Sequence, residues 1–350
     1  MERLAKADKR LAATTDQWDA GPWLLNTPKG IVDLRTGKMR PARVDDYATK
    51  ITAVAPGGEC PTWQRFLRRV TGDNQELIAF LRRVCGYALT GITREQALFF
   101  LYGTGANGKG VFLSTVIGIL ADYHMSAAIE TFTASQSERH PTDLAGLRGA
   151  RLVTATETEE GRRWAESKIK VLTGGDKIAA RFMRQDFFEF VPSFKLIIAG
   201  NHKPGLRSVD EAIRRRFHLI PFSVTIPSAE RDLVLVEKLK AEWPGILSWM
   251  IQGCLEWQTS GLGVPEVVTE ATASYLEAED AIGAWIEECC ERKPQAWETH
   301  AALFGCWSKW AEKAGEPQRS GKSFTQSLGD RGYHPDRLQG QRGFYGLKIL

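Results

Sequence analysis

A glycine-rich loop constrains the fold of this chain more than any other feature. Residues 98–112 read LFFLYGTGANGKGVF, which is an apolar run, a loop with three glycines, and then an apolar helical pattern. Glycines leave room for backbone N–H groups to surround a phosphate. A helix that begins near Gly110 would point its positive N-terminal end at the same anion. The sequence therefore predicts a phosphate-binding loop between a strand and a helix.

The loop and its lysine form the predicted nucleotide site. Lys109 is expected to reach the β and γ phosphates of a bound triphosphate. Gly110 stands where this motif usually has a serine or threonine that binds magnesium, so we expect water and carboxylates to hold the ion. The predicted nucleotide-binding residues are Gly103, Thr104, Gly105, Ala106, Asn107, Gly108, Lys109, Gly110 and Val111.

Two later apolar runs also end in polar side chains. Residues 151–156 lead into Glu157 and Glu159, and residues 194–200 lead into Asn201. One carboxylate can hold magnesium through its hydration shell while another orients the attacking water; Glu157 is the first choice and Glu159 the second. The amide of Asn201 can hydrogen-bond the γ-phosphate or that water. The alternatives are a solvated acidic turn and a loop-capping asparagine.

A run of three arginines follows two acidic residues, Asp210 and Glu211. An arginine from a neighbouring subunit can neutralise charge that develops during phosphoryl transfer. The alternative is a basic surface that pairs with the two acids. The three arginines are Arg214, Arg215 and Arg216.

Residues 177–183 and 187–191 predict two strands of a hairpin. Period-two alternation places Ile178, Ala180 and Phe182 on one face. Lys177, Ala179 and Arg181 fall on the other face, which leaves basic groups free. Arg184 lies in the predicted turn. An ordinary solvated hairpin is the alternative to a phosphate-binding one.

The pattern of apolar residues predicts four regions. Residues 1–95 predict small β-hairpins and two helices that form a candidate collar, the first with Trp63, Phe66, Leu67 and Val70 at helical spacing. Residues 96–226 alternate strand-like and helical runs, which is typical of an α/β domain around a largely parallel sheet. Residues 227–264 predict a helical extension. Residues 265–350 predict a helix stopped by Gly315, a second helix over 321–330 and a closing hairpin, which together indicate a winged helix.

Composition only weakly limits the partners and the location of the protein. With 46 basic and 42 acidic residues, the net charge of +4 permits an anionic partner without demanding one. The six cysteines lack zinc-site spacing, so we expect reduced core thiols. The start, MERLAKADKR, is charged, and no apolar run is long enough to span a bilayer, so we expect an intracellular protein without a membrane partner.

Several strings in this chain resemble those of superfamily 3 DNA helicases, in particular phage and plasmid primase-helicases. Upstream, LLNTPKGIVDLRTGKMRP and CGYALTG resemble the region before the helicase core in poxvirus-type and phage primase-helicases. The resemblance covers nearly the whole chain. The helicase-like strings are GTGANGKGVFL, then ETEEGRRWAESKIKVLTGGDKIAARFMRQDFFEFVPSFKLIIAGNHKP, and then VDEAIRRRFHLIPF.

This resemblance implies an AAA+ type ATPase that uses ATP and Mg²⁺ and acts as a replicative DNA helicase. Such proteins form rings, usually hexamers, and move on single-stranded or forked DNA, typically 3′ to 5′. A primase or an initiator is a further expected partner, and a phage- or plasmid-encoded protein would work in the cytoplasm of a bacterial host. The implied catalytic residues are Lys109, Glu157, Glu159 and Asn201, with Arg215 or Arg216 acting in trans, Glu157 and Glu159 at the metal, and Lys177, Arg181 and Arg184 on DNA.

Two rival functions stay open at this point. An ATP-binding replication initiator or scaffold would form a ring but unwind nothing. A P-loop kinase of small substrates would share the loop, but the Asn201 and arginine motifs and the winged-helix pattern argue against it.

Overall fold

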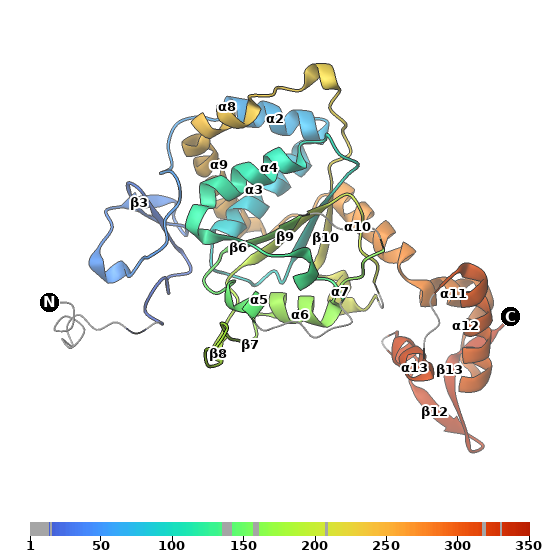
Figure 1. Cartoon of the computed structure of the whole chain (residues 1–350). Coiled ribbons are helices and arrows are strands. Elements are labelled where there is room, and N and C mark those ends of the chain that lie inside the picture. Colours follow the sequence, from blue (N-terminus) through green and yellow to red (C-terminus); the bar gives the residue numbers. More distant parts are fainter. Residues whose placement is uncertain are drawn as a thin grey trace. The chain divides into compact units, whose positions relative to one another are not determined.

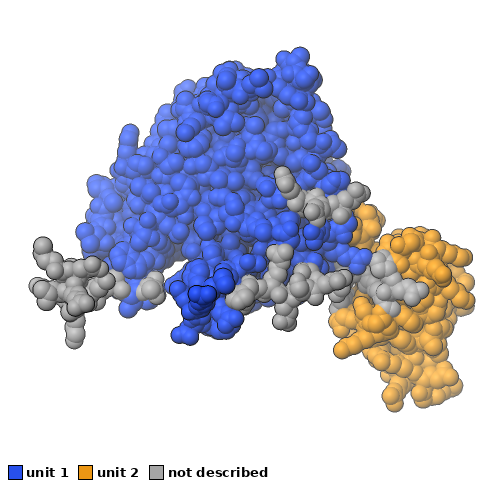
Figure 2. Space-filling model, in the orientation of Figure 1, with its two compact units in different colours: residues 1–204, 216–271 blue, residues 205–215, 272–350 orange. Residues whose placement is uncertain are grey.

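The computed structural model describes residues 14, 16–134, 142–156, 161–206, 209–316, 320–329 and 331–350. The chain divides into two compact units (Figure 2). Unit 1 comprises residues 1–204 and 216–271, and unit 2 comprises residues 205–215 and 272–350. The predicted regions 1–95, 96–226 and 227–264 thus fall mainly in one unit.

A five-stranded sheet forms the centre of unit 1. Its strand order is β10-β4-β9-β6-β5, and every neighbouring pair is parallel. This confirms the predicted α/β fold with a central parallel sheet. The strands are β4 (Leu98–Tyr102), β5 (His124–Ser126), β6 (Leu152–Thr156), β9 (Lys195–Gly200) and β10 (Phe217–Pro221).

Helices cover both faces of this sheet (Figure 1). The strands are buried apolar runs, as expected of a parallel sheet whose two faces are both covered. The helices of unit 1 are α2 (Pro61–Thr71), α3 (Gln75–Leu89), α4 (Lys109–Leu120), α5 (Thr142–Ala145), α6 (Glu166–Gly174), α8 (Leu235–Ala241), α9 (Trp243–Ser260) and the first part of α10 (Glu266–Ala278), with short 3₁₀ turns at Val44–Asp46, Ala121–Tyr123, Ile129–Thr131 and Ser228–Glu230.

Two small antiparallel sheets also belong to unit 1. The first joins β1 (Leu24–Thr27), β2 (Gly30–Asp33) and β3 (Lys38–Arg40), which confirms the predicted N-terminal hairpins. The second pairs β7 (Ile178–Ala180) with β8 (Phe188–Phe190).

The helical layer is built around aromatic packing. Trp63 of α2 is fully buried and stacks on Phe112 of α4 at 5.6 Å between ring centroids, while Trp249 of α9 meets it edge-on at 5.7 Å. Trp257 is also fully buried, so these tryptophans pack the core. Because α2, α4 and α9 share this core, the predicted collar and helical extension join the sheet domain.

Unit 2 has its own core and its own sheet. The antiparallel strand order is β11-β13-β12, and the core is centred on Trp285, Trp307 and Phe324. The helix ending at Ala314 is stopped by left-handed Gly315 (φ 71°), as predicted. The elements are α7 (Glu211–Arg214), the end of α10, α11 (Ala281–Cys289), β11 (Cys290–Thr299), α12 (His300–Ala314), α13 (Gly321–Gly329), β12 (Pro335–Leu338) and β13 (Gln341–Ile349).

All six cysteines are unpaired thiols. Cys60, Cys85, Cys254 and Cys290 are buried, whereas Cys289 and Cys306 are half-buried rather than core residues. Within the described residues, no helix is both long and apolar enough to cross a membrane.

The stability of unit 1 is expected to fall in acid because of His218. The ring of His218 on β10 stacks on Phe99 of β4 at 5.4 Å, and burial lowers the pKa of His218 to about 4. Because its folded-state pKa is lowered, neutral His218 contributes its full stability above the unfolded-state pKa near 6.5. This contribution to the free energy of unfolding is lost as the pH falls toward 4. We expect His218 alone to account for a loss of up to about 3 kcal/mol in the free energy of unfolding.

Urea unfolding at a series of pH values between 7 and 4 checks this expectation. His218→Phe keeps a flat ring against Phe99 but cannot take up a proton, so its unfolding free energy should depend less on pH than that of the parent. Identical pH profiles for the two proteins would contradict it.

Candidate nucleotide site

The loop between β4 and α4 requires its glycines. A Cβ on Gly103 would lie 2.3 Å from the carbonyl oxygen of Phe222, and one on Gly108 would lie 2.5 Å from Cγ1 of Val70. Gly108 also has φ 85°, a left-handed conformation that costs other residues energy. Gly108 offers no side chain to cap α4, so the loop presents the N-terminus of a twelve-residue helix to an anion.

Lys109 turns back over this loop. Its Nζ donates to the carbonyl oxygen of Gly103 at 2.6 Å, to Oδ1 of Asn107 at 3.3 Å and to Oδ1 of Asn201 at 3.2 Å. The residue is 7% exposed, and burial lowers the pKa of its ammonium. Nδ2 of Asn107 donates to the carbonyl oxygen of Phe222 at 2.9 Å, which fixes the orientation of the Asn107 side chain beside Lys109. Lys109 is therefore a cation held over a glycine cradle by neutral oxygens.

Asn201 reaches Lys109 because their strands are neighbours. β9 pairs with β4 in parallel register, with Gly200 opposite Tyr102, and Asn201 follows directly. Two residues 92 positions apart therefore meet at the carboxyl edge of the sheet, the edge at which open α/β sheets bind ligands.

Lys203 is a second cation near the loop that the sequence did not single out. Its Nζ lies 4.1 Å from the ring centroid of Tyr102, the last residue of β4, and burial lowers its pKa. Its only sequence signal was its place two residues after Asn201.

The predicted acidic residues Glu157 and Glu159 lie outside the described residues. β6, which leads into them, ends at Thr156, opposite Ala199 of β9. Within the described part of the chain, no group of three His, Cys, Asp or Glu side chains is placed to hold a metal ion.

A cavity of about 610 Å³ opens beside the loop. Phe66, Val111, Ile226 and Leu235 supply apolar surface, and the N–H of Ile226 donates to the carbonyl oxygen of Ala106 at 2.8 Å. This volume and lining suit a flat organic group next to a phosphate site. The sequence pattern assigned Phe66 to the helical core and gave no sign of the cavity. Its remaining lining residues are Thr62, Arg65, Arg69, Ala106, Gly108, Glu230, Arg231 and Asp232.

The three arginines have different environments. Arg214 and Arg215 are exposed, whereas Arg216 is 5% exposed and donates to Oγ1 of Thr173 at 3.1 Å and to Oε1 of Gln96 at 3.2 Å. Of the two predicted trans-acting residues, Arg215 is therefore the one that a neighbouring molecule can reach.

The predicted hairpin is present, but its paired strands are shorter than the sequence indicated. Ile178 and Ala180 are buried and Ala179 is exposed, which confirms the predicted alternation. Lys177 is exposed and lies 3.9 Å from Glu189.

The end of the hairpin combines basic and aromatic groups. Arg184 is exposed in the turn with φ 60°, and the guanidinium of Arg181 lies 4.8 Å from the ring centroid of Phe187. Phe182, Met183 and Phe187 are 42%, 68% and 60% exposed. The exposure of these apolar side chains was not predicted, because the strand pattern placed Phe182 on the buried face.

Comparison with known proteins adds family evidence to this geometry. Residues 1–72 match the family model "D5 N terminal like", and residues 101–216 match a family of unknown function, DUF5906. The chain is 26% identical over 295 residues to "Putative helicase L207/L206" of Acanthamoeba polyphaga mimivirus. It is 24% identical over 269 residues to "Putative helicase 022R" of Frog virus 3. These matches cover 77% and 70% of this chain.

The chain spans only 30% and 27% of the lengths of these two relatives. Among solved structures, it resembles the C-terminal region (305–718) of NrS-1 with a TM-score of 0.55, at 12% identity over 85% of this chain and 78% of that one. A second apo structure of that region gives a TM-score of 0.51, at 11% identity over 84% of this chain and 77% of that one. The two relatives are named as putative helicases, and the likeness to the solved structures shows a shared fold, which is consistent with a P-loop NTPase-like core.

Gly110 gives the first test of the site. The residue is exposed, and a Cβ there would have no neighbouring atom within 4 Å, so a serine fits without rearrangement. Its hydroxyl would add the magnesium ligand that phosphate-binding loops usually carry. We expect Gly110→Ser to lower the Mg²⁺ concentration for half-maximal ATP hydrolysis by about fivefold.

Magnesium titration of the hydrolysis rate measures this effect. Gly110→Ala is the matched control because it adds the same Cβ without the hydroxyl. An equal magnesium requirement in the serine and alanine variants would show that position 110 does not face the metal.

Proposed function

We propose that this protein is an ATP-dependent DNA helicase of replication. The observation that carries the proposal is the meeting of Lys109 and Asn201 over a glycine loop at the carboxyl ends of two adjacent parallel strands. A cation and an amide at this position can contact the terminal phosphates of a nucleotide. The two relatives named as helicases support the choice of a DNA motor over other P-loop enzymes.

In this proposal, residues 103–111 cradle the phosphates and the cavity beside Phe66 receives the base and sugar. The loop suits a phosphate because it carries Lys109 and the N-terminus of α4. Its conformation needs glycines, since a Cβ at Gly103 or Gly108 would collide with neighbouring atoms of the protein. Glu157 and Glu159 would hold Mg²⁺ and orient water, and the ion would neutralise charge on the phosphates. Asn201 would sense the γ-phosphate.

We propose that ATP binds between subunits of a ring, which is usually a hexamer in the families that the sequence resembles. Arg215 of one subunit would complete the site of its neighbour, and the ring would move on single-stranded or forked DNA from 3′ to 5′. A primase or an initiator would act with it. We also propose that the core is of the AAA+ type and that the chain consists of the four regions 1–95, 96–226, 227–264 and 265–350.

DNA contacts are assigned to the hairpin and to unit 2. Lys177, Arg181 and Arg184 would bind backbone phosphates, and the exposed rings of Phe182 and Phe187 offer faces on which bases can stack. From α11 to β13 the order of elements is helix-strand-helix-helix-strand-strand, which supports the winged-helix assignment.

Strand displacement on a forked DNA duplex tests this function. The parent chain should displace a labelled strand in the presence of ATP and Mg²⁺, and Glu157→Gln should bind ATP but displace nothing. ATP-dependent assembly that persists in Glu157→Gln, without displacement by the parent, would instead indicate an initiator or scaffold.

A further inference from the structure

The segment that carries Arg215 belongs to unit 2, although the strands on either side of it belong to unit 1. β9 ends at Gly200 and β10 begins at Phe217, while residues 205–215 between them form part of the C-terminal unit. α7 is short, with only four residues, and Ile213 at its centre is fully buried. Propensity alone would not hold so short a helix, so its position depends on its contacts.

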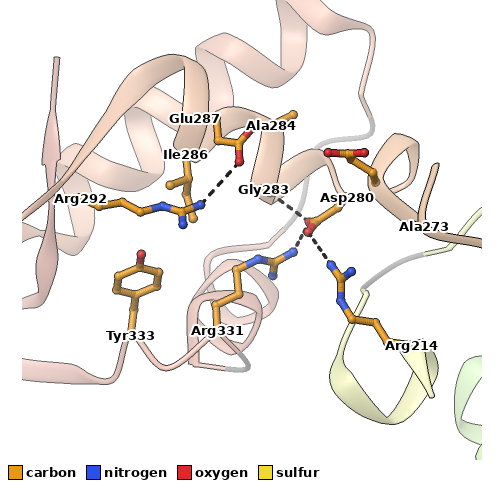
Figure 3. A pocket seen from close by; sticks show the side chains of 11 residues that line it. Arg214, Ala273, Asp280, Gly283, Ala284, Ile286, Glu287, Arg292, Arg331 and Tyr333 are labelled. Atoms are coloured by element: carbon orange, nitrogen blue, oxygen red, sulfur yellow. Dashed lines mark hydrogen bonds and ion pairs between the residues drawn. The ribbon is translucent and has the colours of Figure 1, made fainter. Parts of the chain in front are cut away.

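Asp280 supplies the central contact. It caps α11 by accepting from the N–H of Gly283 at 2.9 Å, and its carboxylate pairs with Arg331 and, at 3.5 Å, with Arg214 (Figure 3). The Asp280 side chain is only 14% exposed and that of Arg331 is 17% exposed. The sheltered pair of Asp280 with Arg331 is held more firmly than a surface ion pair, whereas the side chain of Arg214 is 44% exposed and forms the more open of the two pairs.

These contacts join three elements of unit 2. Arg331 also donates to the carbonyl oxygen of Ser327 in α13 at 2.8 Å, and the N–H of Leu206 donates to Oε2 of Glu279 at 2.8 Å. Asp280 therefore connects α7, the start of α11 and the end of α13. The three charged side chains line a cavity of about 510 Å³ (Figure 3).

We infer that Asp280 is a positioning residue for Arg215, acting through Arg214. Arg214 is the last residue of α7, and Arg215 follows it as the exposed C-cap. A carboxylate that fixes Arg214 limits where the next side chain can reach. The C-terminal unit thereby controls the geometry of the trans-acting arginine. A substitution in that unit that breaks the Asp280–Arg214 ion pair therefore lowers the rate of ATP hydrolysis. The inference rests on the proposed function.

Asp280→Asn tests the inference with little disturbance of the fold. Asparagine is as good an N-cap as aspartate, so α11 keeps its cap while the charge that holds Arg214 and Arg331 is lost. We expect the kcat for ATP hydrolysis to fall about tenfold, with the Kd for ATP unchanged. Arg214→Gln should give the same loss, and the double variant should lose no more than either single variant.

The chain offers a matched control in the same unit. Arg292 and Glu287 form an ion pair at 3.7 Å whose side chains are 63% and 72% exposed. Glu287→Gln removes a carboxylate from that pair without touching α7, so the hydrolysis rate should stay at the parent value.

Three results would overturn the inference. If Arg215→Ala abolishes hydrolysis while Asp280→Asn and Arg214→Gln hydrolyse ATP at the parent rate, the positioning role fails and the proposed function survives. If Asp280→Asn lowers only the melting temperature, the contact is structural. Absence of ATP hydrolysis in the parent chain would overturn the inference together with the proposed function.

Discussion

Arg215→Ala is expected to lower the kcat for ATP hydrolysis about 10³-fold, which is the usual contribution of an arginine that acts across a subunit interface. The Kd for ATP should change little, because in the proposed function the phosphates are held by the glycine loop and Lys109, which lies over that loop in the same subunit. Steady-state hydrolysis and titration with a fluorescent ATP analogue measure the two quantities separately.

Substitution of Arg216 is expected to affect stability, in contrast to substitution of Arg215. Because Arg216 is buried against Thr173 and Gln96, Arg216→Gln should lower the melting temperature, whereas Arg215→Ala should not. A normal kcat in Arg215→Ala would show that the trans-acting group lies elsewhere.

Gly86→Ala is expected to destabilise unit 1 by about 3 kcal/mol, although alanine favours helices. Gly86 of α3 lies against α9, where an added Cβ would be 2.1 Å from the backbone nitrogen of Cys254. Gly253 of α9 makes the reciprocal approach, with its Cβ position 2.0 Å from the carbonyl oxygen of Arg82. Backbone at this distance cannot move aside as a flexible side chain can, so the two helices must separate.

Urea or thermal unfolding of the variant measures this cost. Gly110→Ala makes the same chemical change in another helix of unit 1 with open space around it, and it should be neutral or slightly stabilising. Equal stabilities for the two variants would show that α3 and α9 are not packed this closely.

Local patterns predicted much of this fold. The stripe Trp63, Phe66, Leu67 and Val70 is buried as expected of one helix face, and left-handed Gly72 ends α2. The three apolar runs that precede Gly103, Glu157 and Asn201 are strands β4, β6 and β9, and β9 lies between β4 and β6 in the sheet. Because parallel strands place their carboxyl ends at one edge, Asn201 lies beside the glycine loop, where it accepts a hydrogen bond from Lys109. The sequence assigned both residues to a nucleotide but did not predict this direct contact.

Features that depend on tertiary packing could not be predicted. Arg151 and Lys195 carry charges that suggest a surface, yet both are buried and donate to backbone carbonyl oxygens, including those of Leu89 and Thr90 at the end of α3. α7 belongs to unit 2, where Arg214 pairs with Asp280, 66 residues further along the chain. A single sequence contains no signal for such pairings.

ATP hydrolysis by the purified chain, with and without single-stranded DNA, tests the central claim most directly. The account predicts that hydrolysis requires Mg²⁺, that DNA stimulates it, and that Lys109→Ala abolishes it, because the alanine leaves no cation over the phosphates. Failure of the parent chain to bind ATP, or hydrolysis that persists in Lys109→Ala, would contradict the assignment of this loop as the nucleotide site.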